Sequence, residues 1–156
     1  MTPGPRTIVT AVPAPRIMLG KTAPAVYRAI DALDRSVELD PALRELVKLR
    51  ASQLNGCAYC LSLHNEDARK AGEDQIRLDV LAGWREAGDL FDERERAALA
   101  LVDAVTLMRD PGDAHEAAAE VFSAEELDGL LWQAIAINAW NRQAVTTRSR
   151  PQPAVA

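Results

Sequence analysis

The stretch ELVKLRASQLNGCAYCLSLHNEDARKAG, residues 45–72, contains two helical patterns joined by one break. The break is Asn55-Gly56, because glycine tolerates the left-handed conformation that closes a helix at its C-terminus. A second helix therefore starts at or near Cys57 and ends before Gly72. If the connection is tight, the second helix runs back along the first, and the two form a helical hairpin.

The first helix of this hairpin starts upstream at Asp40-Pro41, an N-cap residue followed by proline at the first helical position. Apolar residues then recur every three or four positions: Leu43, Leu46, Val47, Ala51 and Leu54. This spacing predicts one apolar helical face.

The rest of the chain also has a helical pattern, with abundant alanine and few β-branched runs. Capping boxes at Asp92 and Ser123 predict helices that end near Met108 and Thr147. Three further helices are expected: residues 24–36, a segment with Ile76, Val80, Leu81 and Trp84, and a short helix from Asp113 with Ala114, Ala117, Ala118 and Val121 on one face. The sequence therefore predicts an all-α protein, a single domain of about seven helices.

The helical domain is expected to span residues 21–148. Four prolines break any helix in residues 1–20, which are therefore predicted to form an extended N-terminal arm: Pro3, Pro5, Pro13 and Pro15. Residues 149–156 are predicted to be a frayed tail.

The composition is that of an ordinary globular domain, with 48% apolar and 26% charged residues. A net charge of −5 offers no basic surface, so we expect no nucleic-acid partner. The longest apolar runs fall short of the roughly 20 residues that span a bilayer, and the proline-rich N-terminus lacks the apolar region of a secretory signal. We therefore expect a cytoplasmic protein with no membrane partner. In that compartment, two close cysteines are more often redox-active or metal-binding than a structural staple.

Cys57 and Cys60 are the only cysteines of the chain, and His64 is one of its two histidines. Free N–H groups and the helix dipole at the start of the second helix favour a thiolate at Cys57. Cys60 and His64 are one turn apart, close enough for their side chains to meet. All three belong to the stripe expected to face inward: Cys57, Cys60, Leu61, His64, Ala68 and Ala71. A CxxC pair in this place can close into a disulfide and reopen.

Two other interpretations of these residues stay open. The cysteines can be small buried hydrophobic residues, and His64 can be a core residue with its hydrogen bonds satisfied. A zinc site would use both thiols and His64, but no second CxxC or histidine pair completes four ligands, and His115 lies in a separate short helix. We expect no metal and no bound cofactor.

Glu45 lies twelve residues before Cys57, on the flank of the first helix beside Leu49 and Ser52. A helical glutamate in such a position is ordinarily solvated. In a tight hairpin, however, Glu45 approaches the His64 end of the second helix. A carboxylate there would orient the imidazole and raise its basicity.

Residues 45–72, with ERAALALVDAVT and AINAWNRQAV downstream, resemble the core of the AhpD-like alkylhydroperoxidases of the carboxymuconolactone decarboxylase superfamily. The spacing of Glu, CxxC and His is the most specific part of this resemblance. It implies an AhpD-like helical bundle and a thiol-dependent peroxidase that reduces hydroperoxides in antioxidant defence. It also implies a homo-oligomer, either a trimer or a hexamer. Lactone decarboxylation is not expected, since the decarboxylase branch lacks the cysteine pair.

By this resemblance, Cys60 is the peroxidatic nucleophile and Cys57 is the resolving cysteine that closes the disulfide. His64 would help to deprotonate Cys60, and Glu45 would complete the proton relay. Helix-dipole reasoning instead activates Cys57 first; the neighbouring His64 is the physical reason to prefer Cys60. The best-known members have a histidine just before the second cysteine. This chain has Tyr59 there, a weaker proton carrier near neutral pH with a reference pKa of about 10.

The implied substrate is a small hydroperoxide. The implied reductant is a dithiol protein, lipoyl-bearing or thioredoxin-like, that restores both thiols by exchange. A function of a different class is also possible: a non-catalytic redox-sensing or helical oligomerisation protein with a switchable CxxC disulfide. An enzyme would consume many equivalents of peroxide per chain, whereas a sensor would consume about one.

The last helix has an apolar stripe interrupted by Asn138 and Asn141; its other members are Leu127, Leu131, Ala134 and Val145. Buried amides need partners, so we expect these asparagines to bind backbone or another subunit. Trp132, Trp140 and Arg142 are residue types enriched at interfaces. The alternative is a helix that belongs simply to the core.

Overall fold

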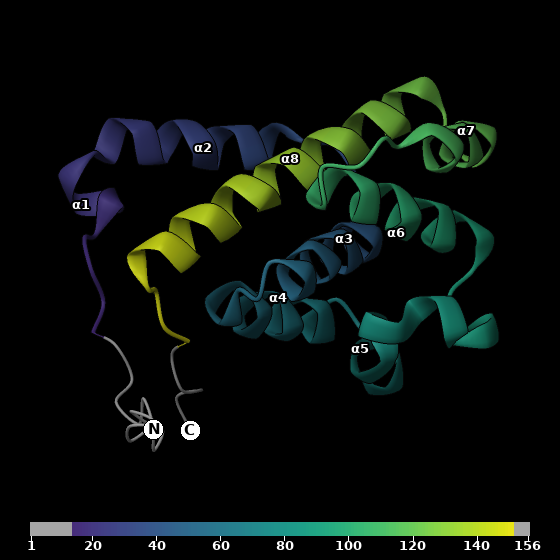
Figure 1. The fold of residues 1–156 in the computed structure, drawn as a ribbon, viewed down its shortest axis with the longest axis horizontal. Helices are drawn as coiled ribbons and strands as arrows, with labels where there is room; N and C mark the ends of the chain where they lie inside the picture. Colours follow the sequence, from purple (N-terminus) through teal and green to yellow (C-terminus); the bar gives the residue numbers. More distant parts are fainter. Residues whose placement is uncertain (1–13, 152–156) are drawn as a thin grey trace, which may run out of the picture.

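The computed structural model describes residues 14–151, and this part of the chain folds into helices without a β-strand (Figure 1). The all-α prediction is therefore confirmed. The α-helices are α1 (Leu19–Thr22), α2 (Pro24–Ser36), α3 (Pro41–Leu54), α4 (Ala58–Lys70), α5 (Gln75–Val80), α6 (Glu93–Thr106), α7 (Gly112–Val121) and α8 (Ala124–Thr147). Two short 3₁₀ helices, η1 (Leu81–Glu86) and η2 (Gly88–Leu90), lie between α5 and α6.

Helix starts that the sequence predicted from cap chemistry are confirmed. The carboxylate of Asp40 accepts a hydrogen bond from the Leu43 N–H at 3.0 Å. Both capping boxes form, at Asp92 before α6 and at Ser123 before α8. These signals are local, because a cap satisfies N–H groups within three residues of itself, so a short stretch of sequence is enough to show them.

The ends and faces of some helices differ from the predictions. The α6 helix ends at Thr106, because Met108 turns into the left-handed region with a φ of 53°. The helix expected around Ile76 and Trp84 divides, and its second half tightens into η1. Ile76 is exposed, and Leu78 is buried in its place.

The N-terminal arm and C-terminal tail are described only in part. Leu19 and Gly20, which the arm of residues 1–20 was expected to include, lie in α1. The backbone N–H of Arg16 donates to the Thr147 carbonyl at 2.9 Å, and the N–H of Ser149 donates to the Ala144 carbonyl at 2.9 Å. The predictions for residues 1–13 and 152–156 lie outside the described residues.

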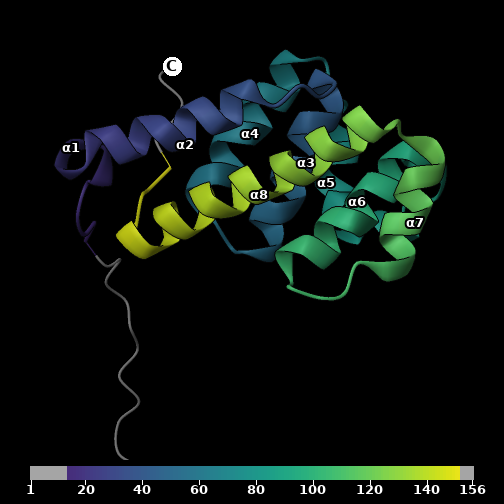
Figure 2. The ribbon, with the colours of Figure 1, turned by 90° about the horizontal axis from the view of Figure 1, so that it is seen from above.

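The helix at the centre of the fold is α3, which packs against α4, α6 and α8 (Figures 1 and 2). Every residue from Leu46 to Ser52 is buried, including Lys48 and Arg50. The single apolar face expected for this helix was therefore incomplete: the middle of α3, residues 46–52, is buried on all sides, and Leu54 at its end is only half-buried. A buried charge without a partner is costly. Lys48 therefore pairs with Asp34, and Arg50 pairs with Asp103.

The α2 helix lies beside α8 in both views (Figures 1 and 2). No residue of α2 is fully buried. The segment that joins α2 to α3 passes close to α8 at Gly129, where a Cβ atom would lie 2.4 Å from the Glu38 carbonyl oxygen. A glycine is required there for the two backbones to approach. Among the described residues, no helix has the length and apolar character needed to cross a membrane.

Candidate active site

The turn between α3 and α4 positions the two cysteines. Gly56 has a φ of 63°, which is the left-handed conformation expected at this break. The Cys57 N–H donates to the Ser52 carbonyl at 3.0 Å and closes the end of α3. Cys57 is then the N-cap of α4: its sulfur accepts a hydrogen bond from the Cys60 N–H at 3.3 Å. Both cysteines are free thiols and both are buried.

The two thiols share a hydrogen bond that separates their pKa values. The Cys60 thiol donates to the Cys57 sulfur, and this bond lowers the pKa of Cys57 from 9.0 to about 7. Burial opposes this effect, while the Cys60 N–H, the Asn141 side chain and the Tyr59 N–H add to it. The same thiol–thiol bond, together with burial, raises the pKa of Cys60. The pair therefore holds one proton more tightly than the other, and Cys57 is the more acidic thiol.

Glu45 and His64 meet across the hairpin, as expected from its antiparallel geometry. The Nδ1 atom of His64 lies 2.9 Å from the Oε2 atom of Glu45. An ionised carboxylate can only accept, so Nδ1 carries the proton and Nε2 is the basic nitrogen. Both side chains are largely buried, so Glu45 is not the ordinary solvated helix residue.

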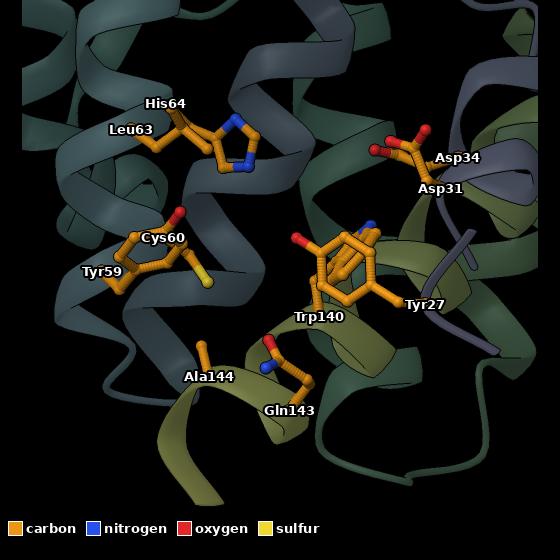
Figure 3. A pocket seen from close by; sticks show the side chains of 10 residues that line it. All are labelled: Tyr27, Asp31, Asp34, Tyr59, Cys60, Leu63, His64, Trp140, Gln143 and Ala144. Atoms are coloured by element: carbon orange, nitrogen blue, oxygen red, sulfur yellow. The ribbon is translucent and has the colours of Figure 1, made fainter. Parts of the chain in front are cut away.

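Cys60 and His64 open onto a cavity of about 170 Å³ (Figure 3). The α4 helix forms one wall, and α2 and α8 form the opposite wall. The full lining consists of Tyr27, Asp31, Asp34, Tyr59, Cys60, Leu63, His64, Trp140, Gln143 and Ala144. Cys57 is not part of this lining. The structure thus brings Cys60 and His64 to the cavity, with Cys57 and Glu45 behind them.

Sequence reasoning missed the residues that α2 contributes. Asp34 accepts hydrogen bonds from Gln133 Nε2 at 2.7 Å and from Lys48 Nζ at 3.1 Å. Burial disfavours the charged form of Asp34, but these two partners prevail and lower its pKa below the ordinary 3.8. The one available signal in the sequence was Lys48, a cation in the middle of an apolar helix, which requires a carboxylate partner.

Sequence reasoning also missed an amide network that joins the turn to α8. The Asn55 Nδ2 group donates to the Oδ1 atoms of both Asn138 and Asn141 at 2.9 Å. Asn141 donates to Ser52 Oγ at 3.0 Å, and Asn138 donates to Thr106 Oγ1 at 2.9 Å.

The prediction that these asparagines bind backbone groups or another subunit is confirmed only for one backbone bond of Asn138. Asn138 does bind one backbone group, the Ala134 carbonyl at 2.9 Å, but most partners are side chains of the same chain. Another correction concerns the apolar stripes: Val145 on α8 and Ala71 after α4 are both exposed. Trp132 is also exposed, whereas Trp140 packs edge-on against Tyr27 with the ring centroids 5.0 Å apart.

One group of side chains among the described residues could together offer ligands to a metal ion. Glu45, His64 and Asp67 place one ligand atom each within 4.8 Å of one another. Glu45 and His64 already bind each other, and neither cysteine belongs to the group. The alternative of a zinc ion held by both thiols and His64 gains no support from this geometry. His115, the other histidine, lies on α7 and is exposed.

The sequence profile of the carboxymuconolactone decarboxylase family matches residues 24–104. The chain belongs to this family. An uncharacterised protein, YdfG of Bacillus subtilis, is 38% identical over 110 residues, which cover 69% of this chain and 74% of YdfG. The family match begins at α2 and includes the α3–α4 hairpin, and it ends within α6, before α8.

Solved structures identify the AhpD-like type of fold. A protein of unknown function from Agrobacterium tumefaciens, suggested to be the antioxidant defence protein AhpD, is 37% identical, with a TM-score of 0.84 over 90% of this chain and 99% of the relative. The debrominase Bmp8 is 21% identical, with a TM-score of 0.75 over 86% of this chain and 74% of Bmp8. The resemblance to AhpD-like proteins is thus confirmed. Bmp8 shows that the same fold also occurs in a protein with a different reaction.

Proposed function

We propose that this protein is a thiol-dependent peroxidase that reduces hydroperoxides through a dithiol–disulfide cycle of Cys57 and Cys60. The observation that carries the proposal is the placement of the only cysteine pair: the thiols bind each other, and Cys60 opens onto a cavity that His64 also lines. The family and the Agrobacterium relative support a peroxidase-related role.

The cysteine with the lowered pKa is not the cysteine that lines the cavity, and the proposed mechanism gives each of them a separate role. Cys57 has the lowered pKa, but only Cys60 lines the cavity. When a hydroperoxide enters, the Cys60 proton moves to Nε2 of His64, while Glu45 stabilises the resulting imidazolium. The Cys60 sulfur then attacks the distal peroxide oxygen, the O–O bond breaks, and the alcohol leaves with the proton from His64. Cys60 is oxidised to a sulfenic acid.

Cys57 completes the cycle because it is the more acidic thiol and lies next to Cys60. Its sulfur attacks the sulfenic sulfur, the S–O bond breaks, and the disulfide forms; the leaving hydroxide takes up a proton from solvent and departs as water. A protein dithiol, lipoyl-bearing or thioredoxin-like, then reduces the disulfide by exchange. This chemistry needs no metal and no bound organic cofactor. We further propose a cytoplasmic homo-oligomer, for which the exposed apolar residues of α8, Trp132, Ile135 and Val145, offer surface.

A second function is favoured by one observation. The Cys57 sulfur caps α4 by accepting from the Cys60 N–H. Disulfide formation would change this cap, so oxidation could alter the start of α4 and act as a redox signal without turnover. The two functions differ in stoichiometry, since an enzyme consumes many equivalents of peroxide per chain and a switch consumes about one.

The deciding experiment is peroxide consumption with a panel of dithiol donors. We expect multiple turnovers for wild type and none for Cys60→Ser. Cys57→Ser should make one turnover and accumulate a sulfenic acid at Cys60, detected by a sulfenic-acid reagent and peptide mass mapping. Ser62→Ala, an exposed position on α4, is the matched control and should behave as wild type. Labelling at Cys57 in Cys60→Ser at a comparable rate would reverse the assigned roles, and a single equivalent in wild type would favour the switch.

A further inference from the structure

The wall of the active-site cavity that faces Cys60 carries a tyrosine that the mechanism above does not use. Tyr27 of α2 lines the cavity, and its hydroxyl end is directed across the cavity toward α4 (Figure 3). Its ring has a neighbour on two sides: Trp140 packs edge-on with the ring centroids 5.0 Å apart, and a Cβ atom on Gly20 of α1 would lie 3.4 Å from the Cδ2 atom. These contacts hold the hydroxyl in the cavity, although 39% of the residue surface is exposed.

The Tyr27 hydroxyl is near enough to the opposite wall to influence groups there. Burial raises the pKa of Tyr59 on α4, and the nearby Tyr27 and the two cysteines, which can each carry negative charge, raise this pKa further. Within residues 14–151 the Tyr27 O–H has no hydrogen-bond acceptor. It can therefore donate to a molecule bound in the cavity.

The proposed reaction places its leaving oxygen on the Tyr27 side of the cavity. The Cys60 sulfur approaches the distal peroxide oxygen from α4, and the bond that breaks lies opposite the attacking atom. The leaving oxygen therefore faces α2 and α8, and it gains negative charge as the O–O bond breaks. Asp31 and Asp34 of α2 would repel this charge, and no lysine or arginine belongs to the lining that the described residues form. A hydrogen-bond donor aimed at the leaving oxygen would stabilise the transition state.

Three side chains of the facing wall carry an N–H or O–H group: Tyr27, Trp140 and Gln143. In Figure 3 the Tyr27 hydroxyl is directed toward the part of α4 between Cys60 and His64. Gln143 lies on the side of Cys60 away from His64, and Trp140 lies behind the Tyr27 ring in the same view. Tyr27 is thus the donor best placed to meet an oxygen that must also receive a proton from His64.

We propose that Tyr27 is a catalytic residue whose hydroxyl donates a hydrogen bond to the leaving oxygen of the peroxide. As the S–O bond to Cys60 forms, the O–O bond breaks, and the leaving oxygen takes the proton that His64 received from Cys60. Tyr27 keeps its own proton. Cys60 is oxidised to a sulfenic acid, and the hydroperoxide is reduced to the alcohol. This inference rests on the peroxidase function proposed above and adds a residue of α2 to its first step.

The test compares ethyl hydroperoxide with peracetic acid, two peroxides of similar size whose leaving groups differ. Ethoxide is a strong base and needs a donor, whereas acetate spreads its charge over two oxygens and leaves without one. Tyr27→Phe removes only the hydroxyl. It should slow the oxidation of Cys60 by ethyl hydroperoxide roughly 10–100-fold, from the loss of one hydrogen bond to a charged acceptor. The reaction with peracetic acid should slow much less. Thiol loss in the first turnover, with peptide mass mapping of Cys60, gives both rates.

Two controls separate the leaving oxygen from the nucleophile. Ser36→Ala removes a hydroxyl from the same helix; Ser36 is exposed, donates to the Leu33 carbonyl at 2.8 Å and does not line the active-site cavity. This variant should react as wild type with both peroxides. Alkylation of Cys60 by iodoacetamide expels iodide, which needs no donor, so its rate should be equal in wild type and Tyr27→Phe. Folding and oligomeric size are checked first.

The pattern of losses decides the inference. An equal loss with both peroxides, or slower alkylation, would show that Tyr27→Phe disturbs Cys60 itself, and overturns the inference. An unchanged rate with ethyl hydroperoxide also overturns it, and a selective loss in Gln143→Leu would then assign the donor to Gln143. If wild type makes only one turnover with every dithiol, the peroxidase function fails, but a selective loss in Tyr27→Phe still supports the donor. If Cys60 reacts with neither peroxide, both proposals are wrong.

Discussion

The α3–α4 hairpin and the wall formed by α2 and α8 face each other across one cavity, but they are built on different principles. The hairpin brings together Cys60, His64 and Glu45 from residues less than twenty positions apart in the chain. The wall brings Asp34 of α2 to Gln133 of α8, which are 99 positions apart. The hairpin supplies groups that can exchange protons and electrons, whereas the wall supplies shape, charge and anchoring. The comparison predicts that hairpin variants change the chemistry and that wall variants change stability and substrate choice.

The largest effect is expected in the hairpin, at His64. In the proposed mechanism His64 accepts the Cys60 proton, so the peroxide step should slow by ~10²–10⁴-fold in His64→Ala. Raising the pH should recover part of this loss, because free thiolate then forms without the base. Glu45→Gln keeps the size of the side chain but removes its charge, and should give a smaller loss of the same kind.

The measurement is the rate of thiol loss against pH, after folding and oligomeric size are checked. His115→Ala is the control, since His115 is exposed on α7. If both site variants react at the wild-type rate, His64 and Glu45 have only structural roles, and the hairpin does not differ from the wall in the way proposed.

The next effect is expected in the wall, at Asp34. Asp34→Asn leaves Lys48 mostly buried without its counter-charge, and loss of one member of a buried pair costs about 3 kcal/mol of unfolding free energy. The folded pKa of Asp34 lies below its ordinary value of 3.8. The stabilisation is therefore fully present above that ordinary value and is lost as the pH falls through the folded pKa.

Denaturant unfolding near neutral pH and at about pH 3 tests this prediction for Asp34. Wild type should lose more stability on acidification than Asp34→Asn. The control is Asp31→Asn, whose pair with Arg35 is exposed and should contribute little. A Cys60 oxidation rate that falls in Asp34→Asn as far as in His64→Ala would contradict the division between wall and hairpin.

The smallest effect is expected at Asn141, which joins the two regions. Asn141→Leu leaves Ser52 Oγ without its donor and removes one acceptor of Asn55, which should cost about 1–3 kcal/mol of unfolding free energy. Asn141 also helps to lower the pKa of Cys57, so that pKa should rise above about 7 in the variant.

Denaturant unfolding measures the loss of stability in Asn141→Leu, and the pH dependence of thiolate ultraviolet absorbance measures the pKa of Cys57. Asn65→Leu, on α4 with a single local bond to the Leu61 carbonyl, is the control and should change neither quantity by as much. An unchanged thiolate titration in Asn141→Leu would show that the cysteine pair is electrostatically independent of α8.

The sequence by itself determined what depends on neighbours within a few turns. It predicted the caps at Asp40, Asp92 and Ser123, the break at Gly56, and the single face that Cys57, Cys60 and His64 share. Cap hydrogen bonds and helical periodicity act over three to four residues, so a short stretch of sequence is enough to predict them. Even the meeting of Glu45 with His64 followed from a short hairpin.

Only the tertiary structure decided what covers that face and which distant side chain reaches the cysteines. The direction in which an amphipathic helix such as α2 packs depends on the shape of the whole core, so nothing near Asp34 indicated that it would face His64 across a cavity. Cys60, three residues away, is the main cause of the lowered pKa of Cys57, and Asn141 adds to it; Asn141 lies 84 positions along the chain and reaches Cys57 only after α8 packs against α4. Packing between distant segments forms the cavity and adds Asn141 to the causes of the Cys57 pKa shift, and no local pattern in the sequence indicates either.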